Sequence, residues 1–365
     1  MMSRSGPSVD EQDLLIDAQD LAALSRECFE RLGVPAQDAR AVTDVLIDAN
    51  LHGVPSHGFQ RVPIYMRRVN AGLAGGTERL SVVSQSGALC RMDAHYALGP
   101  AASVKAVDRS LELAREFGIG LVAIGRTTHF GRAGYYARRA AHAGLVSIVM
   151  SNAVKRMAPY GAADAFLGTN PLAIAIPLAD HDPFVLDMST SIAAQGRITR
   201  AKLLDEPIPE GLALGPDGQP TTDPASALAG SLLPLGGPKG SGLALAISLL
   251  VVLLAGAESD DEMGSMYKDF DRPQNSGHIF IAIEGSRLGG AGRRLDEAIE
   301  RLGALRPVGG CAQVEYPGQA GARLARARLR DGVPIQPAEL RDAAQTCDAC
   351  GLHDLSDRAL GLLNR

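Results

Sequence analysis

The chain has 365 residues, 46% of them hydrophobic, a formal net charge of −5 and five cysteines. This length predicts two domains, and the modest acidic charge without a basic block argues against a nucleic-acid partner. The odd cysteine count and a polar N-terminus (1–20) without a signal-peptide pattern predict a cytoplasmic protein with reduced thiols.

The first part of the chain is predicted to be helical. The apolar spacing favours helices over 17–32, 36–51 and 63–71, followed by a glycine-rich turn at 72–76. Asp17 is a plausible N-cap for the first helix, because an aspartate side chain accepts hydrogen bonds from free helical N–H groups.

From residue 103 the pattern changes to helices alternating with apolar strands, which is typical of an α/β domain with a buried sheet. Residues 204–224, rich in Pro, Gly and Asp, are predicted to be a surface connection. The predicted helices are 103–116 and 132–142, and the predicted strands are 119–124, 145–150, 172–176, 184–187 and 278–283.

The most apolar run is Leu243 to Ala255. Its 13 residues fall short of the roughly 20 that cross a bilayer, so we expect a core helix packed on the sheet and no membrane association. The pair Cys347 and Cys350 has CxxC spacing, but without a second ligand pair it is interpreted as two thiols on a C-terminal helix. No metal site is predicted.

Glycine-rich motifs for cofactor binding are scarce. Gly289–Gly292 follows no suitable strand and is interpreted as a loop, so a Rossmann or P-loop enzyme is disfavoured. Gly236–Gly242 precedes the apolar helix, where backbone N–H groups and Lys239 could hold an anion. A plain helix-initiating turn is the alternative.

Two short stretches place a histidine among small residues, Gly53–Gly58 around His57 and Thr128–Gly131 around His129. Histidine changes charge near neutral pH and is a frequent proton donor or acceptor. A histidine after a helix can also simply cap carbonyl groups. Ser56 and Arg61 place further polar groups beside His57, which a cap does not require.

These stretches occur with further motifs whose order and spacing are informative. Together they closely resemble the malate/L-lactate dehydrogenase family of the non-Rossmann type, over roughly residues 14–357. The further motifs are Met157–Gly161, Leu167–Pro171, Leu186–Ser191, Gly236–Gly242, Asn275–His278 and Tyr316–Gly318.

The resemblance implies a homodimeric NAD- or NADP-dependent oxidoreductase acting on a small carboxylate substrate. It implies a non-Rossmann α/β cofactor domain with a large mixed sheet, here 77–299. A second domain would combine both chain ends, 1–76 and 300–365, and the active site would lie between the two.

Carried onto this sequence, the resemblance makes His57 the proton donor and acceptor, with His129 as a second candidate and Asp187 at the active site. Arg61 would bind the substrate carboxylate, since guanidinium and carboxylate form a two-pronged pair. Asp187 could also be an N-cap and Arg61 a surface ion-pair residue. The other predicted substrate contacts are Ser56, Thr169 and Asn170. The predicted cofactor contacts are Met188, Ser189, Lys239, Gly318 and Gln319.

The reaction expected is hydride transfer between nicotinamide and C2 of a small 2-hydroxy or 2-oxo acid. Within the family the alternative is reduction of a cyclic imino acid such as Δ1-piperideine-2-carboxylate or Δ1-pyrroline-2-carboxylate. A silent nucleotide-binding member is a further alternative. Pro55 and Thr128 differ from the residues common in the family at these positions, so the identity of the substrate is not determined. The sequence also does not determine the choice between NAD and NADP or the physiological direction of the reaction.

Overall fold

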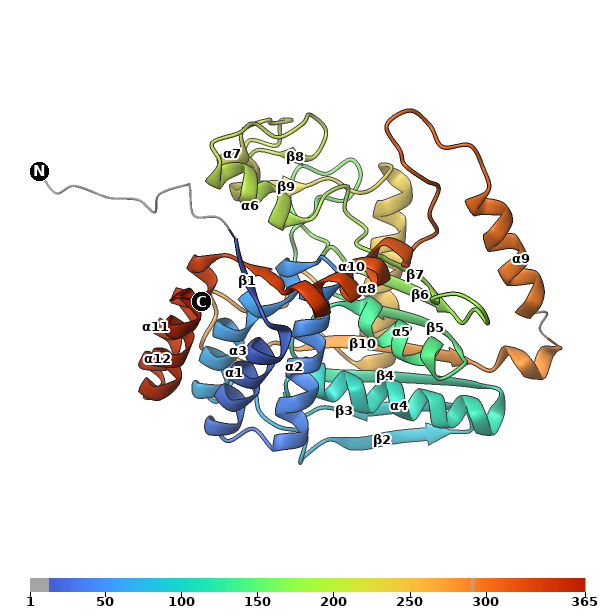
Figure 1. Ribbon diagram of the computed structural model, residues 1–365, viewed down its shortest axis with the longest axis horizontal. Helices are drawn as coiled ribbons and strands as arrows, with labels where there is room; N and C mark the ends of the chain where they lie inside the picture. The colour runs from blue at the N-terminus through green and yellow to red at the C-terminus, as the bar shows by residue number, and fades with distance from the viewer. Residues whose placement is uncertain (1–12, 290–291, 365) are drawn as a thin grey trace, which may run out of the picture.

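The computed structural model describes residues 13–289 and 292–364, and its centre is a seven-stranded mixed sheet (Figure 1). The strand order is β2-β3-β4-β10-β5-β6-β7, in which β3 and β4 run parallel and the other neighbours are antiparallel. The strands are β2 (Ser81–Ser86), β3 (Leu89–Asp93), β4 (Ile119–Thr127), β5 (Val146–Ser151), β6 (Leu172–Ile176), β7 (Phe184–Met188) and β10 (Ser276–Ile283).

Helices cover both faces of this sheet. Helices α4 (Gly99–Phe117) and α5 (Ala133–His142) pack on one face, and α8 (Pro238–Ala255) packs against β4, β5 and β10. Covering both faces explains why the central strands read as continuous apolar runs. The predicted α/β class and the large mixed sheet are therefore confirmed, with every predicted strand present.

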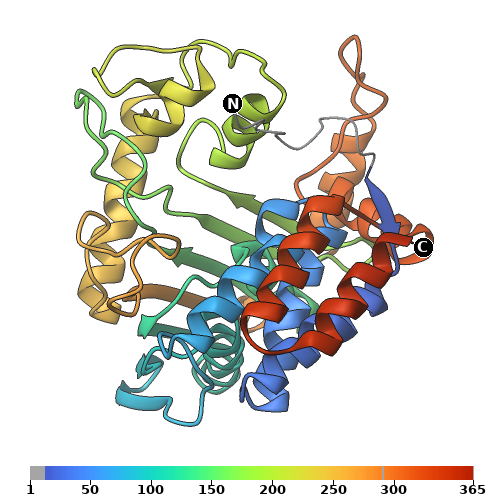
Figure 2. The same cartoon turned by 90° about the vertical axis from the view of Figure 1, so that its left-hand side faces the viewer.

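The two chain ends share one hydrophobic core (Figure 2). Strand β1 (Leu14–Ile16) pairs antiparallel with β11 (Val333–Ile335). The helices α1 (Ala18–Arg31), α2 (Ala36–Leu51) and α3 (Val62–Asn70) pack with α11 (Pro337–Ala349) and α12 (His353–Gly361). Asp17 accepts hydrogen bonds from two backbone N–H groups of α1, which confirms the predicted N-cap. The domain limits themselves remain a prediction.

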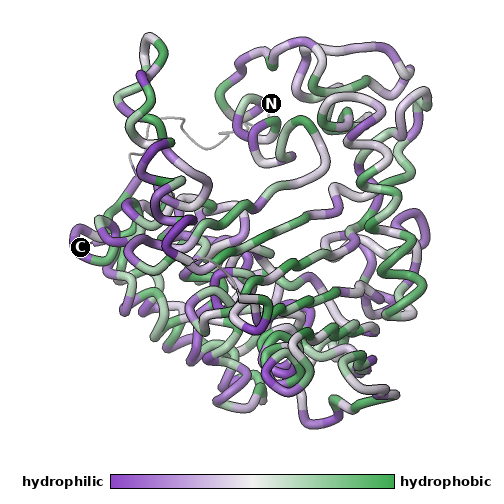
Figure 3. The backbone as a smooth tube through the Cα atoms, turned by 90° about the vertical axis from the view of Figure 1, so that its right-hand side faces the viewer, coloured by the Kyte–Doolittle hydropathy of each residue, from purple (hydrophilic) through white to green (hydrophobic). Residues whose placement is uncertain are grey.

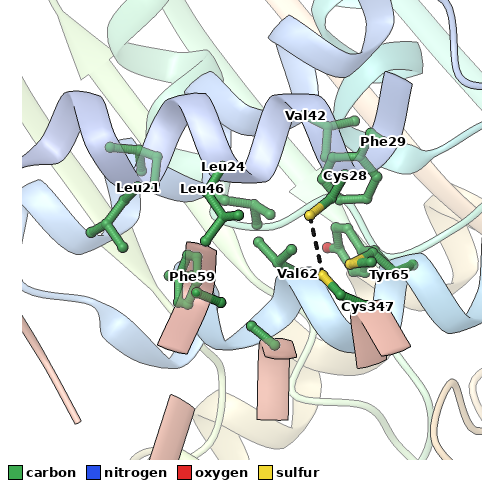
Figure 4. Packing of buried hydrophobic residues seen from close by; sticks show 14 of the residues in the cluster. Leu21, Leu24, Cys28, Phe29, Val42, Leu46, Phe59, Val62, Tyr65 and Cys347 are labelled. Atoms are coloured by element: carbon green, nitrogen blue, oxygen red, sulfur yellow. Dashed lines mark hydrogen bonds between the residues drawn. The ribbon is translucent and has the colours of Figure 1, made fainter. Parts of the chain in front are cut away.

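The cysteines of this core face one another. Cys28 on α1 and Cys347 on α11 are buried, with 3.6 Å between their Sγ atoms (Figure 4). Cys350 is the residue that caps α11, so the CxxC pair lies at the end of a C-terminal helix as predicted.

Helix α8 differs from the predicted core helix. It begins at Pro238 and buries only one side, through Ala244, Ile247 and Val251, while Leu249 and Leu253 are 60% and 76% exposed. By length and composition alone α8 is apolar enough to cross a membrane, and its hydropathy is visible in Figure 3. In the fold it is a sheet-packing helix with a second, uncovered apolar side.

Other elements escaped the sequence patterns. The β2-β3 hairpin was not predicted, and 204–224 is more than a connection, because Ile208 and Leu212 belong to a small hydrophobic core of their own. Of Gly289–Gly292, Gly289 ends a short turn and Gly292 begins a helix, while 290–291 lie outside the described residues. The remaining elements are α6 (Gln195–Leu203), α7 (Pro224–Ala229), β8 (Ala213–Leu214), β9 (Ser231–Leu232), α9 (Gly292–Gly303), α10 (Gln319–Asp331) and the short 3-10 helices η1 (Pro55–His57), η2 (Phe59–Arg61), η3 (Gly285–Leu288) and η4 (Leu362–Asn364).

Candidate active site

A cavity of about 410 Å³ lies where η1 and η2 meet the carboxyl-terminal ends of β4, β5 and β7. It brings together both predicted histidines and most of the predicted substrate residues. The predicted residues that line it are Ser56, His57, Arg61, His129, Thr169, Asp187, Met188 and Ser189.

The turn that carries His57 is shaped by one tight contact. A side chain at Gly58 would place its Cβ 2.0 Å from Asn50 Oδ1, which accepts the backbone N–H of Phe59. Within the turn, Arg61 Nε donates to the Ser56 carbonyl at 2.6 Å, and Ser56 Oγ lies 3.0 Å from His57 Nδ1. The predicted grouping of three polar side chains on one turn is therefore present.

The second histidine lies directly against the first. The rings of His57 and His129 are stacked with centroids 5.6 Å apart. Tyr65 Oη is 2.6 Å from His129 Nδ1, so this buried phenol orients the ring. Sequence reasoning missed Tyr65, although its position four residues after Arg61 places both on the same side of the chain.

The electrostatic surroundings keep both histidines neutral. Burial, and then the positive charges of Arg61 and Arg132, lower the pKa of His57 to about 3. Burial is also the main cause that lowers the pKa of His129 well below its usual range, followed by His57 and Arg61. Both rings are therefore unprotonated at neutral pH, and their affinity for a proton is low.

Arg61 itself lies enclosed without a counter-ion. Burial lowers its pKa, and no carboxylate of the described part of the chain forms an ion pair with it. The Tyr267 ring lies beneath the guanidinium at 5.5 Å. A buried charge without a partner is costly, so this arrangement favours an anionic ligand.

Asp187 is held in place by an arginine that sequence reasoning missed. Arg132 Nε donates to Asp187 Oδ2 at 2.6 Å, and the two side chains are 13% and 15% exposed. Gly134 leaves room for this pair, since a Cβ there would lie 2.6 Å from Asp187 Oδ2. The signal available in the sequence was only that Arg132 follows His129 by three residues.

Asn170 is not positioned as a substrate ligand. Its side chain is fully buried, donates to the Ala244 carbonyl and Asp260 Oδ2, and accepts the N–H of Ala153. All of its polar atoms are therefore used to join the β5–β6 connection to α8. The substrate role expected for Asn170 does not fit this geometry.

Three predicted cofactor residues lie outside the cavity. Lys239 is exposed at the start of α8. Gly318, with a φ of 101°, caps α10, which begins at Gln319; the Gln319 Oε1 accepts the N–H of Tyr316. Gln319 borders a separate polar hollow of about 660 Å³. Their cofactor roles remain predictions.

An α/β fold whose cavity joins two neutral histidines to an enclosed arginine favours an enzyme that acts on a small anion. The sequence profile of the malate/L-lactate dehydrogenase family matches residues 16–343. The chain belongs to this family of NAD(P)-dependent 2-hydroxyacid dehydrogenases and is a dehydrogenase.

The proteins to which this chain is similar are named after several different substrates. The chain is 39% identical over 272 residues to (2R)-3-sulfolactate dehydrogenase (NADP(+)) of Chromohalobacter salexigens, covering 74% of this chain and 81% of that protein. It is 31% identical to ureidoglycolate dehydrogenase (NAD(+)) of Escherichia coli over 86% and 92% of the two chains. Its fold matches the structure of sulfolactate dehydrogenase from Methanocaldococcus jannaschii with a TM-score of 0.87 at 34% identity, covering 94% and 99%. Homologues thus use NAD⁺ or NADP⁺.

Proposed function

We propose that this dehydrogenase transfers hydride between a nicotinamide cofactor and C2 of a small 2-hydroxy or 2-oxo acid, with the substrate carboxylate on Arg61. The observation that carries the proposal is the enclosed, unpaired guanidinium of Arg61 beside the neutral ring of His57. This pair provides an anchor for an anion and a proton acceptor on one turn of the chain.

The chain's own residues account for the proton movement. In oxidation, His57 accepts the hydroxyl proton of the substrate while Arg61 fixes the carboxylate, so that C2 has one orientation in the cavity. In reduction, a protonated His57 donates to the oxygen. Positioned proton transfer of this kind contributes about 10²–10⁴ in rate. His129 is the alternative carrier, because its ring lies against His57 and its pKa is lowered in the same way.

The cavity also suits a cofactor. Met188 and Ser189 line it where β7 ends, and Arg132 Nη1 is buried there without a hydrogen-bond partner. These groups would hold the nicotinamide end of the cofactor. The proposed contacts for the parts of the cofactor farther from the nicotinamide are Lys239, Gly318 and Gln319. Bound nicotinamide supplies or accepts the hydride.

The test is a single assay of nicotinamide absorbance with NADH or NADPH and a panel of 2-oxo acids and cyclic imino acids. Turnover of 2-oxo acids supports the proposal. Turnover of Δ1-piperideine-2-carboxylate alone would replace the proposed reaction with imine reduction. Cofactor binding without turnover of any substrate would favour a nucleotide-binding protein without this activity.

Variants then assign the proton carrier. We expect His57→Ala to lower kcat severely and to leave the cofactor Kd near normal, with His129→Ala as the parallel variant. Intact turnover of His57→Ala at saturating substrate would transfer the proton role to His129.

We also propose that the uncovered side of α8 packs against a second copy of the chain. Leu245, Leu249 and Leu253 form a stripe four residues apart and are 42%, 60% and 76% exposed. A continuous exposed apolar stripe is typical of an interaction surface. Leu253→Asp should convert a dimer to a monomer in sedimentation, whereas Leu329→Asp on α10 should not.

A further inference from the structure

Part of the cavity wall is irregular backbone. The connection from α8 to β10, 256–275, is described throughout and contains turns but neither helix nor strand. The residues of this connection that line the cavity are Met263, Met266, Tyr267 and Gln274. Because no ladder of backbone hydrogen bonds fixes this connection, bonds from side chains must set its path.

Arg68 on α3 supplies three of those bonds. This residue is only 3% exposed. Its Nη1 donates to the Asp269 carbonyl at 2.7 Å and to the Met266 carbonyl at 3.4 Å. Its Nη2 donates to the Arg272 carbonyl at 3.1 Å, and the centroid of the Phe270 ring lies 5.3 Å from its Cζ. One buried guanidinium thus binds three carbonyls of one short stretch of chain.

The charge of Arg68 is costly where it lies. Burial lowers its pKa, and no carboxylate among the described residues forms an ion pair with it. Its Nε is buried without a hydrogen-bond partner. An apolar side chain would fill this space at a lower cost in free energy. The guanidinium at this position therefore indicates that the path of the stretch it binds matters.

The same helix connects Arg68 to the proposed anion anchor. Arg61 is the N-cap residue of α3 and Arg68 follows it by seven positions, about two helical turns, so both lie on one side of the helix. Arg61 Nε donates to the Ser56 carbonyl at 2.6 Å, and the Tyr267 ring lies 5.5 Å from its Cζ. Tyr267 directly follows Met266, whose carbonyl Arg68 binds. The position of the ring over Arg61 thus depends on Arg68.

We infer that Arg68 is a positioning residue that holds 266–272 against α3, so that the Tyr267 ring covers one face of the Arg61 guanidinium and orients it for a carboxylate. This inference rests on the proposed function, in which Arg61 binds the carboxylate of the substrate. The ring keeps water from that face and restricts the rotamers of Arg61. Less conformational freedom is then lost when the anion binds.

The kinetic experiment uses the 2-oxo acid that the wild type turns over best. Arg68→Met should raise its KM about 2–10-fold, the effect of one long side chain that is no longer pre-oriented, with kcat and the cofactor Kd unchanged. Arg68→Lys should restore part of the loss, since an ammonium group still donates to carbonyls. Arg67→Met removes the neighbouring exposed arginine, which pairs with Asp342, and should leave the KM unchanged. A purely structural role would lower the yield of active enzyme and not raise the KM.

Variants of Tyr267 test the same step without a change in the core. Tyr267 is 53% exposed, so we expect its variants to fold. Tyr267→Leu should raise the KM as much as Arg68→Met does, and Tyr267→Phe, which keeps the ring, should not. The double variant Arg68→Met with Tyr267→Leu should show no further increase, because both changes remove the same contact with Arg61. An unchanged KM in Tyr267→Leu, or additive effects in the double variant, overturns the inference.

A fluorescence measurement is independent of turnover. The chain has no tryptophan, so Tyr267→Trp introduces a single one. Acrylamide should quench its emission more strongly when Arg68→Met is added, and Arg67→Met should have no such effect. Equal quenching with and without Arg68 overturns the inference. If the wild type turns over no 2-oxo acid while the quenching still depends on Arg68, the proposed function fails and the positioning of Tyr267 by Arg68 stands.

Discussion

The low proton affinity of the two histidines makes a quantitative prediction about pH. An ordinary histidine has a pKa near 6.5, so as the catalytic base it would lose about 30-fold in kcat/KM for oxidation between neutral pH and pH 5. In this cavity, burial lowers the pKa of His57 to about 3, with the positive charges of Arg61 and Arg132 as the next causes. We therefore expect kcat/KM for 2-hydroxy acid oxidation to stay constant from pH 8 to pH 5.

The assay is initial-rate kinetics in constant-ionic-strength buffers, with stability checked at each pH by recovery of activity at pH 7.5. The value of kcat/KM reports the free enzyme, so it tests the structure directly. In Arg61→Gln one of the two positive neighbours is lost, and the acid limb should move to higher pH. A break near pH 6.5 in the wild type would refute the reasoning for His57, and for His129, whose pKa is lowered as well.

Three further predictions concern single side chains. Arg61→Met should raise the KM for a 2-oxo acid about 10–100-fold with an unchanged cofactor Kd in fluorescence titration, since only the carboxylate anchor is lost. Asp187→Asn leaves Arg132 charged and enclosed, and should destabilise the protein by about 3–5 kcal/mol in urea denaturation; a loss below 1 kcal/mol would contradict the pairing. His278 is fully buried, and burial lowers its pKa to about 3. Between pH 6.5 and pH 3 it takes up a proton only when the chain unfolds, so the free energy of unfolding should decrease as the pH is lowered through this range. From pH 7.5 to 5.5 this histidine should contribute a loss of about 1.4 kcal/mol, which His278→Gln should remove.

Elements with local signals were predictable from the sequence. Helix α2 and strand β6 match their predicted limits, because a proline and a glycine bound the helix and an unbroken apolar run defines the strand. The β2 strand was missed because its residues are Ser, Val and Gln, exposed on both faces at the sheet edge. The two-sided character of α8 was missed because its leucines surround the helix and only packing decides which are buried.

The candidate site likewise combines residues that sequence spacing places together with residues that only the fold brings together. His57, Ser56 and Arg61 lie on one turn, so their proximity follows from sequence spacing. Arg132 and Asp187 are 55 residues apart and meet only because β7 ends beside the start of α5. Asn170 is the opposite case. It lies in a recognisable motif that predicted a substrate contact, but its side chain forms hydrogen bonds with Asp260 and with backbone groups instead.

The charges of the cavity also couple substrate binding to protonation. Arg61 is one cause of the low pKa of His57, and a carboxylate bound to Arg61 removes that cause. By linkage, substrate binding must raise the proton affinity of His57 by the same factor by which protonation of His57 strengthens substrate binding. Under the proposed function, the bound 2-oxo acid would thus raise the pKa of its own proton donor. The pKa seen in kcat for reduction, which reports the complex, should lie above the pKa seen in kcat/KM, and Arg61→Gln should narrow the gap between them.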